Sequence, residues 1–144
     1  MYKIFIEKNI STKALLDKVL KKINIIDEII YNEYGKPYLK SNKIYFSLSD
    51  SKEYTVCAIS DKEIGVDIEH ITYKDRVIKK VCTEEEIKHI KTPEDFTIMW
   101  VKKESYSKLI GLGLSYDFKK IDTNKNKFDI FKKEDYYIAV CMEE

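Results

Sequence analysis

The stretch Ile64-Gly65-Val66-Asp67-Ile68-Glu69 sets the expected fold of this chain, because its apolar residues alternate strictly with other types. Strict alternation predicts a β-strand with one apolar face and one face that carries two carboxylates. Side chains two residues apart on a strand point the same way, with Cα atoms roughly 6.6 Å apart. Asp67 and Glu69 can therefore converge on one hard cation, and Mg2+ suits carboxylates that leave places for water and phosphate oxygens. The alternative is an ordinary solvated strand face, because the Asp-x-Glu pattern is common.

The composition is that of an ordinary globular domain. A chain of 144 residues is long enough to bury a real core, and we expect a single domain over residues 1–144. The net charge of +1 gives no bulk electrostatic case for nucleic acid. No apolar run approaches the roughly 20 residues of a membrane span, and the N-terminus lacks an apolar core of signal-peptide type. We therefore expect a cytoplasmic protein that binds neither nucleic acid nor membrane.

The cysteines and arginines restrict the chemistry further. The three cysteines have no metal-ligand spacing, and Cys57 and Cys141 lie in apolar strand-like runs where we expect them to be reduced and buried. Of the 26 basic residues only Arg76 is an arginine, so bidentate arginine clamps on phosphate are nearly unavailable.

Periodicity and capping signals predict strands and helices in a regular order. We expect a helix over 93–110, because Pro93 suits a first helical position and Gly111 suits a helix end. Thr83 followed by three acids predicts another helix start. The stretch 23–31 fits either a short strand or a continued helix, and 32–37 fits a turn. The other expected elements are strands at 2–6, 44–48, 54–60, 64–71, 128–131 and 136–142, and helices at 12–22 and 75–81.

The order of these elements repeats. Each half begins with a strand, continues with helix and ends in a hairpin, and the returning strands resemble each other from Tyr54 and from Tyr136 onward. This predicts an α+β fold of two pseudo-symmetric strand-helix-hairpin halves, at about 1–61 and 62–144. Coincidence is the rival explanation, because the similarity is faint.

A second informative stretch is Trp100-Val101-Lys102-Lys103-Glu104-Ser105-Tyr106-Ser107-Lys108-Leu109-Ile110-Gly111. On a helix, Glu104 and Lys108 lie along one side with Trp100 and Gly111. One interpretation is a surface ion pair worth a few tenths of a kcal/mol. The other makes Glu104 a third metal carboxylate and Lys108 a phosphate contact beside it, which together serve a diphosphate leaving group.

Four motifs resemble a known family in their order and spacing. They are Tyr34-Gly35-Lys36-Pro37, Phe46-Ser47-Leu48-Ser49-Asp50-Ser51, Gly65-Val66-Asp67-Ile68-Glu69 and Trp100-x-x-Lys103-Glu104-Ser105-x-x-Lys108-x-x-Gly111-x-Gly113. This pattern is similar to the 4'-phosphopantetheinyl transferases of the surfactin-synthetase-activating type. The resemblance runs from about Glu33 to the end of the chain.

The resemblance implies a reaction and its reactants. Such enzymes transfer the 4'-phosphopantetheine arm of coenzyme A to a serine of an acyl or peptidyl carrier protein. They need Mg2+ and release adenosine 3',5'-bisphosphate. By resemblance, Asp67, Glu69 and Glu104 are the metal ligands. Lys108 is the residue that contacts the phosphates and can protonate the leaving group.

The resemblance also suggests roles for residues outside the metal set. Glu86 falls where the family has a carboxylate proposed as the general base, although a first-turn helix acid is the other explanation. Lys103 matches a lysine near the diphosphate, with a solvated lysine as the alternative. The remaining residues expected to bind the coenzyme are Lys36 and Pro37 in a loop that lines the nucleotide site, and Ser49 and Asp50 in the middle motif.

Two departures from the family pattern affect the same subsite. The family has asparagine at Ser47 and histidine at Asp50, and that histidine touches the nucleotide phosphates. A carboxylate there would repel them by roughly 1–4 kcal/mol at 4 Å. Only 34 residues precede Gly35, and a basic segment that longer members use against the 3'-phosphate has no visible counterpart. We therefore expect weakened use of the 3'-phosphate, so that dephospho-coenzyme A binds comparably.

Two functions from different classes follow. The first is a Mg2+-dependent phosphopantetheinyl transferase, favoured by Asp67, Glu69, Glu104 and Lys108. The second is a catalytically weak or inactive relative that binds carrier protein or nucleotide, favoured by Asp50 and the short N-terminal part. The internal repeat favours a monomer.

Overall fold

The computed structural model describes residues 1–143, apart from the side chain of Leu114. The first half of the chain forms β1 (Tyr2–Lys8), α1 (Thr12–Lys22), β2 (Ile29–Tyr31), β3 (Pro37–Leu39), β4 (Tyr45–Ser51) and β5 (Tyr54–Ser60). The second half forms β6 (Ile64–His70), α2 (Asp75–Val81), α3 (Glu84–Ile87), α4 (Pro93–Ile110), the 3₁₀ turns η1 (Gly113–Ser115) and η2 (Phe118–Lys120), β7 (Phe128–Lys133) and β8 (Tyr136–Met142). The prediction of an α+β fold is confirmed.

The strands form two antiparallel sheets with the same topology. The sheet of the first half has the order β1-β5-β4, and the sheet of the second half has the order β6-β8-β7. In each half the last strand therefore lies in the centre, between the first strand and its own hairpin partner. A small sheet of β2 and β3 stands apart from both. The expected strand-helix-hairpin repeat is thus present as a repeat of topology.

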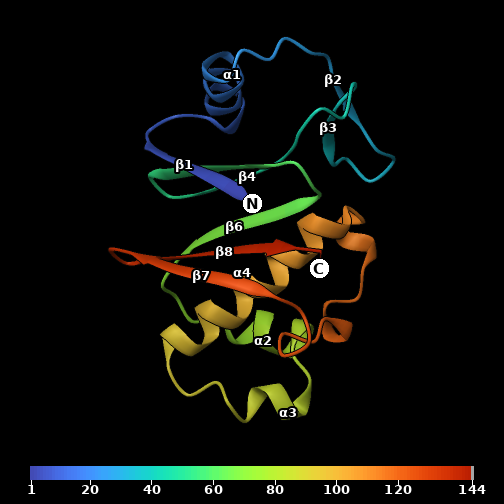
Figure 1. Ribbon diagram of the computed structural model, residues 1–144. Helices are drawn as coiled ribbons and strands as arrows, with labels where there is room; N and C mark the ends of the chain where they lie inside the picture. Colours follow the sequence, from blue (N-terminus) through green and yellow to red (C-terminus); the bar gives the residue numbers. More distant parts are fainter. Residues whose placement is uncertain (144) are drawn as a thin grey trace.

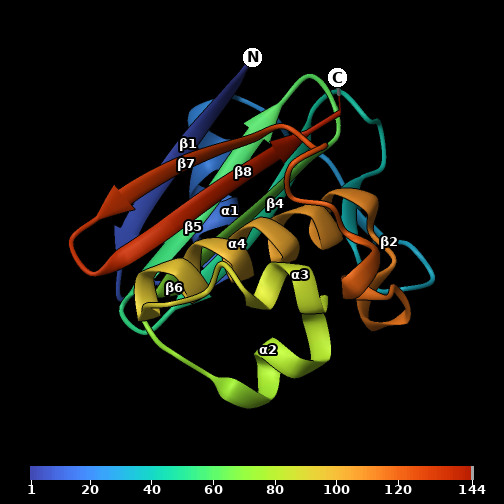
Figure 2. The same cartoon turned by 90° about the horizontal axis from the view of Figure 1, so that it is seen from below.

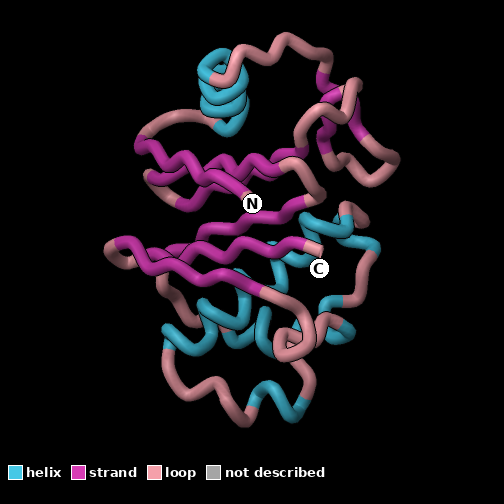
Figure 3. The backbone as a smooth tube through the Cα atoms, in the orientation of Figure 1, coloured by secondary structure: helices cyan, strands magenta, loops and turns pink. Residues whose placement is uncertain are grey.

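The two sheets pack face to face, and helices cover their outer faces (Figure 1). Strands and helices separate into layers in Figure 3, with α1 on one side and the helices of the second half on the other. The core between the sheets is formed by alternating residues of β5, β6 and β8, namely Tyr54, Val56, Ala58, Ile64, Val66, Ile68, Tyr136, Ile138 and Val140. Seen from below in Figure 2, α4 runs across the second sheet.

The hairpin turns of the two halves correspond residue by residue. Lys52 and Glu134, the first residues of the two turns, have φ values of 52° and 53°. The residues that end the turns, Tyr54 and Tyr136, pack edge to face with ring centroids 4.9 Å apart. The faint likeness between the two returning strands therefore reflects equivalent positions that pack against each other between the sheets.

The two halves are also joined by serine side chains. Strands β4 and β6 are edge strands of different sheets, and no backbone ladder pairs them. Instead, the N–H groups of Val66, Ile68 and His70 donate to the hydroxyl oxygens of Ser47, Ser49 and Ser51, at 3.0, 3.3 and 3.0 Å. These bonds satisfy the free edge of β6, because alternate N–H groups of an edge strand have no partner in their own sheet. We call these three hydroxyl groups the serine ladder.

Several boundaries differ from the sequence-based expectations. Strand β4 extends to Ser51, because its last residues pair with β5, and the expected strand end at residue 48 is wrong. Of the stretch 23–31 only Ile29–Tyr31 is a strand, and Pro37 begins β3 instead of ending a turn. Cys57 and Cys141 are free and buried as expected. Within the described residues, none of the helices combines the length and the apolar character that crossing a membrane requires.

Candidate active site

The candidate site lies where β6 meets α4. Gly65 permits this approach, because a Cβ on it would lie 2.0 Å from the backbone oxygen of Ser105 and 2.5 Å from the nitrogen of Leu109. The absence of a side chain at Gly65 therefore leaves room for the backbone of α4. Close contact at Gly65 places the next residues of the outer face, Asp67 and Glu69, against the same helix.

Asp67 is the centre of the site. It is buried, and its Oδ1 accepts a hydrogen bond from Ser49 Oγ at 2.8 Å and another from Lys108 Nζ at 3.2 Å. The Lys108 ammonium also donates to the carbonyl oxygen of Leu48 at 3.2 Å, so it bridges β6 and β4. The other carboxylate oxygen, Oδ2, is buried without a hydrogen-bond partner. An unpartnered buried carboxylate oxygen is costly in isolation and suits a cation ligand.

The three predicted metal carboxylates perturb one another. Burial, followed by the charge of Asp67 and then that of Glu104, raises the pKa of Glu69 to about 9. Burial and the charge of Asp67 raise the pKa of Glu104 to about 7, against the opposing effect of Lys108. Burial raises the pKa of Asp67 as well. Like charges confined in a poorly solvated place produce such shifts, and a divalent cation removes their cause.

The chemical character of these carboxylates suits a cation, although their side chains are not gathered into a metal-binding arrangement in this structure. Within residues 1–143 the structure gathers no group of three or more His, Cys, Asp or Glu side chains close enough to hold a metal ion. The orphaned Oδ2 of Asp67 and the raised pKa values nevertheless describe a donor set that is short of positive charge. All-oxygen carboxylate donors suit Mg2+ better than softer metals.

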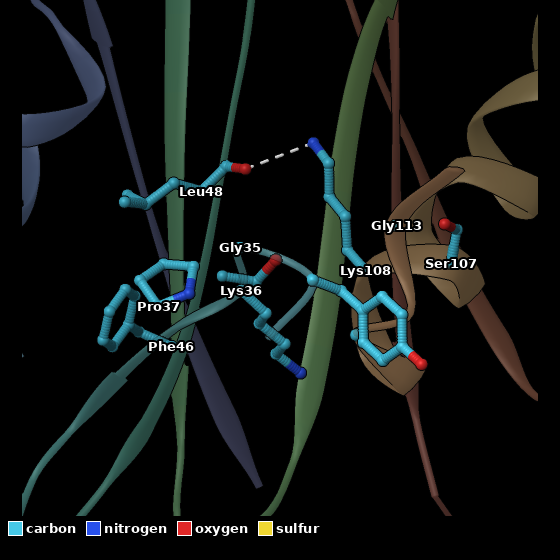
Figure 4. Close-up of a pocket in the computed structure, with 11 residues that line it drawn as sticks. Gly35, Lys36, Pro37, Phe46, Leu48, Ser107, Lys108 and Gly113 are labelled. Atoms are coloured by element: carbon cyan, nitrogen blue, oxygen red, sulfur yellow. Dashed lines mark hydrogen bonds between the residues drawn. The ribbon is translucent and has the colours of Figure 1, made fainter. Parts of the chain in front are cut away.

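A cavity of about 240 Å³ lies beside Lys108 (Figure 4). In Figure 4, Lys108 extends from α4 toward the carbonyl of Leu48 across this space. The walls come from three segments that are far apart in the sequence: the loop before β3, strand β4 and the end of α4. The lining residues are Tyr34, Gly35, Lys36, Pro37, Phe46, Ser47, Leu48, Ser107, Lys108, Gly111 and Gly113.

The predicted coenzyme-binding residues divide into two groups. Lys36, Pro37 and Lys108 line this cavity together. Ser49 and Asp50 are not among its lining residues: Ser49 turns toward Asp67, and Asp50 is an exposed residue near the end of β4. Lys36 donates to the backbone oxygen of Leu109 at 2.8 Å, and burial lowers its pKa.

Lys103 does not fit the role that the sequence suggested. Its side chain is fully buried, and its ammonium donates to Val81 O at 2.7 Å, Glu86 Oε1 at 2.8 Å and Phe118 O at 2.9 Å. An ammonium group has three hydrogens, so this geometry leaves none for a diphosphate. Lys103 is therefore neither a solvated lysine nor free to contact a diphosphate in this structure. Instead, its ammonium holds α2, α3 and η2 against α4.

Glu86 is engaged in structural bonds. Thr83 and Glu86 form a capping box at the start of α3, with Thr83 N donating to Glu86 Oε1 at 2.8 Å and Glu86 N donating to Thr83 Oγ1 at 3.2 Å. The same Oε1 accepts from Lys103. Glu86 is thus an acid in the first turn of a helix, as the alternative explanation expected. Its role as general base stays a prediction.

Sequence reasoning missed the serine ladder and the anchor of the cavity loop. The signal for the ladder was present, because Ser47, Ser49 and Ser51 alternate with larger residues at the spacing of one strand face. Asn32, which organises the loop, gave no signal beyond its place in a turn. Both depend on contacts between segments that are distant in the sequence.

Comparisons with known proteins agree with this geometry. Residues 63–141 match the family model of the 4'-phosphopantetheinyl transferase superfamily. The 4'-phosphopantetheinyl transferase gsp of Aneurinibacillus migulanus is 34% identical over 127 residues, which cover 80% of this chain and 53% of that protein. The 4'-phosphopantetheinyl transferase of Bacillus subtilis is 31% identical over 120 residues, covering 78% of this chain and 50% of that protein. The L-aminoadipate-semialdehyde dehydrogenase-phosphopantetheinyl transferase of Saccharomyces cerevisiae is 30% identical over 128 residues, covering 77% and 46%. The chain thus spans about half the length of the curated relatives it matches.

Proposed function

Because this chain belongs to the 4'-phosphopantetheinyl transferase superfamily, we propose that it transfers the 4'-phosphopantetheine arm of coenzyme A to a serine of an acyl or peptidyl carrier protein. The observation that carries this proposal is the environment of Asp67. Oδ1 of Asp67 accepts a hydrogen bond from Lys108, Oδ2 is buried without a partner, and Lys108 is one of the residues that line the adjoining cavity. A buried carboxylate, a lysine and a cavity are the parts that a diphosphate donor requires.

In this proposal Asp67, Glu69 and Glu104 hold Mg2+. When bound, the cation neutralises the negative charge of the diphosphate and of the departing nucleotide. The chain's own residues prepare this site. Ser49 fixes Oδ1 of Asp67, so Oδ2 is the oxygen left for the cation. Without the cation, the raised pKa values of Glu69 and Glu104 favour their protonated forms. Both carboxyl groups lose these protons when they bind the cation.

The transfer itself needs positioning and charge neutralisation. The serine oxygen of the carrier protein forms a bond to the phosphorus that bears the pantetheine arm. The bond from that phosphorus to the bridging oxygen breaks, and the electron pair leaves with adenosine 3',5'-bisphosphate. Lys108 stands beside the cavity to neutralise or protonate that oxygen, and a carboxylate accepts the serine proton.

Glu86 remains the proposed acceptor of the serine proton, and Glu86→Gln tests it. Glutamine retains a capping-box side chain at this helix position and an acceptor for Lys103, but it is not a base. A loss of about 10²-fold in kcat, with normal thermal stability, supports the general-base role. An unchanged kcat assigns Glu86 to structure alone.

The proposed weak use of the 3'-phosphate depends on Asp50. This side chain is exposed on β4, next to Ser49. Equal transfer rates from coenzyme A and dephospho-coenzyme A support the proposal. A large preference for coenzyme A in the same assay overturns it.

Intact-mass spectrometry of an apo carrier protein tests the function as a whole. The carrier is incubated with this protein, coenzyme A and Mg2+, beside a Glu104→Ala control. A mass gain of one phosphopantetheine that the control abolishes supports both the transferase and Glu104. No gain with several carrier types from folded protein favours the non-catalytic binding relative, and Asp50→His is then the next variant.

A further inference from the structure

Asn32 organises the loop that forms one wall of the cavity. Its Oδ1 accepts from the backbone N–H groups of Tyr34 and Lys36, both at 2.9 Å. The backbone N–H of Asn32 donates to the carbonyl oxygen of Lys36 at 2.9 Å, and the backbone carbonyl oxygen of Asn32 accepts from the N–H of Gly35 at 3.1 Å. One residue therefore makes four bonds within a single turn, and these bonds fix the conformation of the residues that line the cavity.

Asn32 also joins this loop to the end of α4. Its Nδ2 donates to the carbonyl oxygen of Gly111 at 2.8 Å, across 79 positions of the chain. Gly111 ends the helix in the left-handed conformation, with φ of 68°. A Cβ on Gly111 would lie 2.7 Å from Lys36 Cδ and 3.1 Å from Asn32 Nδ2, so the loop is seated directly on this turn. The amide donor meets a carbonyl that the helix itself cannot pair.

The position of this loop on α4 depends on the anchor, because the other supports of β2 and β3 lie away from that helix. Leu39 packs in the core beside α1, and Lys36 and Tyr38 bond to Glu63. Strands β2 and β3 pair only with each other and join neither large sheet (Figure 1). The cavity lies between this loop and the segment 107–113, so its width is set by whatever holds the two together. Two side chains do so, Lys36 through Leu109 O and Asn32 through Gly111 O. Lys36 also lines the cavity, whereas Asn32 does not.

We infer that Asn32 is a positioning residue for the coenzyme site, which holds the 34–37 loop against α4 without touching the coenzyme. This inference rests on the proposed function, because it assigns the cavity to coenzyme A. Among residues 1–143, no hydrogen bond joins Asn32 to Asp67, Glu104 or Lys108, and those three residues are positioned by the packing of β6 on α4. Loosening the loop should therefore weaken coenzyme binding and leave the chemical step unchanged.

Asn32→Asp isolates the bond to α4. Aspartate keeps an acceptor for the two loop N–H groups, but it loses the donor and places a carboxylate against the Gly111 carbonyl and the negative end of the helix. Asn126→Asp is the matched control, because Asn126 Nδ2 also donates to a backbone carbonyl, that of Asp122, at a place that does not line this cavity.

The experiment combines three measurements on the whole chain. These are coenzyme A binding by calorimetry, steady-state transfer to a carrier protein, and hydrogen exchange of the peptide that covers residues 32–39. For Asn32→Asp we expect the dissociation constant and KM for coenzyme A to rise about tenfold, kcat to stay within about twofold, and exchange of the loop to accelerate. The Asn126→Asp control should match the wild type in all three.

The outcomes separate this inference from the proposed function. Unchanged exchange in the loop overturns the anchoring role of Asn32. Faster exchange with unchanged coenzyme affinity overturns the link between the loop and the coenzyme site. An equal loss in kcat and in coenzyme affinity also overturns it, because the change would then reach the chemical step. Wild-type protein that neither binds coenzyme A nor transfers its arm overturns the proposed function, and with it the assignment of this cavity.

Discussion

The outer faces of β1 and β6 occupy equivalent places in the two halves and differ in almost every property. Aligning Tyr54 with Tyr136 through the strand registers pairs Lys3, Phe5 and Glu7 of β1 with Gly65, Asp67 and Glu69 of β6. Phe5 packs against α1 in an apolar cluster, where its counterpart Asp67 is buried with Lys108 and Ser49. Glu7 forms an exposed ion pair with Lys18 of α1, whereas burial raises the pKa of Glu69 to about 9.

The covering helices differ in the same sense. Helix α1 presents an apolar face of Leu15, Leu16, Val19 and Leu20, as an ordinary amphipathic helix does. Helix α4 buries Lys103, Ser105 and Ser107 and approaches β6 closely enough to exclude a Cβ at residue 65. One topology thus supports two arrangements, a scaffold with an apolar outer layer and a site with buried charge. The difference depends on three positions of one strand and on the helix that covers them.

The largest expected effect separates Asp67 from Phe5. Asp67→Asn should lower the rate of phosphopantetheine transfer by about 10²–10³-fold, the size typical of removing one preorganised electrostatic group. Phe5→Leu should leave the rate per folded molecule unchanged, since Phe5 only packs on α1. Initial rates from intact-mass time courses measure both. Equal losses would show that the halves do not divide scaffold from chemistry.

The next effect concerns the strand-to-helix distance. Gly65→Ala should destabilise the protein by about 3 kcal/mol, because the new Cβ meets helix backbone that a rotamer change cannot move. Lys3→Ala, at the equivalent exposed position, should change the free energy of unfolding by less than about 0.5 kcal/mol. Urea unfolding curves give both values. A mild effect of Gly65→Ala would mean that α4 can retreat from β6 at little cost.

A smaller effect should distinguish the contributions of two serines of the serine ladder to the stability of the protein. Ser49→Ala leaves both the Ile68 N–H and Asp67 Oδ1 without this partner, and should cost about 2 kcal/mol. Ser51→Ala removes a single bond to His70 N in a less buried place, and should cost about 1 kcal/mol. Denaturant unfolding distinguishes the two. Equal costs would indicate that Ser49 contributes nothing through Asp67.

The last comparison concerns a pH dependence of stability that belongs to one half. Since the folded-state pKa values of Glu69 and Glu104 are raised to about 9 and about 7, the folded protein binds more protons than the unfolded chain in this range. Stability without the cation should therefore fall as pH rises from about 5 to about 9. Mg2+ competes with those protons, so the rise in Tm on its addition should be larger near pH 8.5 than near pH 6.

Two glutamine variants assign this pH dependence to a half of the molecule. Glu69→Gln should flatten the fall of Tm with pH, whereas Glu7→Gln at the equivalent, half-buried position of β1 should leave it unchanged. Thermal scans in buffers across the pH range provide the comparison. A fall that persists in Glu69→Gln at full size would place its origin outside this carboxylate.

The sequence by itself determined the parts of this protein whose signals are local. The alternation from Ile64 to Glu69 specified a strand with two carboxylates on one face, and Pro93 and Gly111 specified the ends of the helix that carries Glu104 and Lys108. The repeated order of elements specified the two halves. The strand and the helix rest on patterns within one segment, and the two halves rest on the order of such segments, all of which the chain displays before it folds.

Only the tertiary structure decided which of the two lysines on α4 has a structural role and which one lies in the candidate site. Lys103 and Lys108 lie on one helix, but five residues at 3.6 per turn place them on different sides, so one enters a structural core and the other meets Asp67. The serine ladder and the Asn32 anchor likewise depend on which edges and ends of the chain meet. Local periodicity carries no information about such meetings, because they are set by the packing of β6 on α4 and of one half on the other.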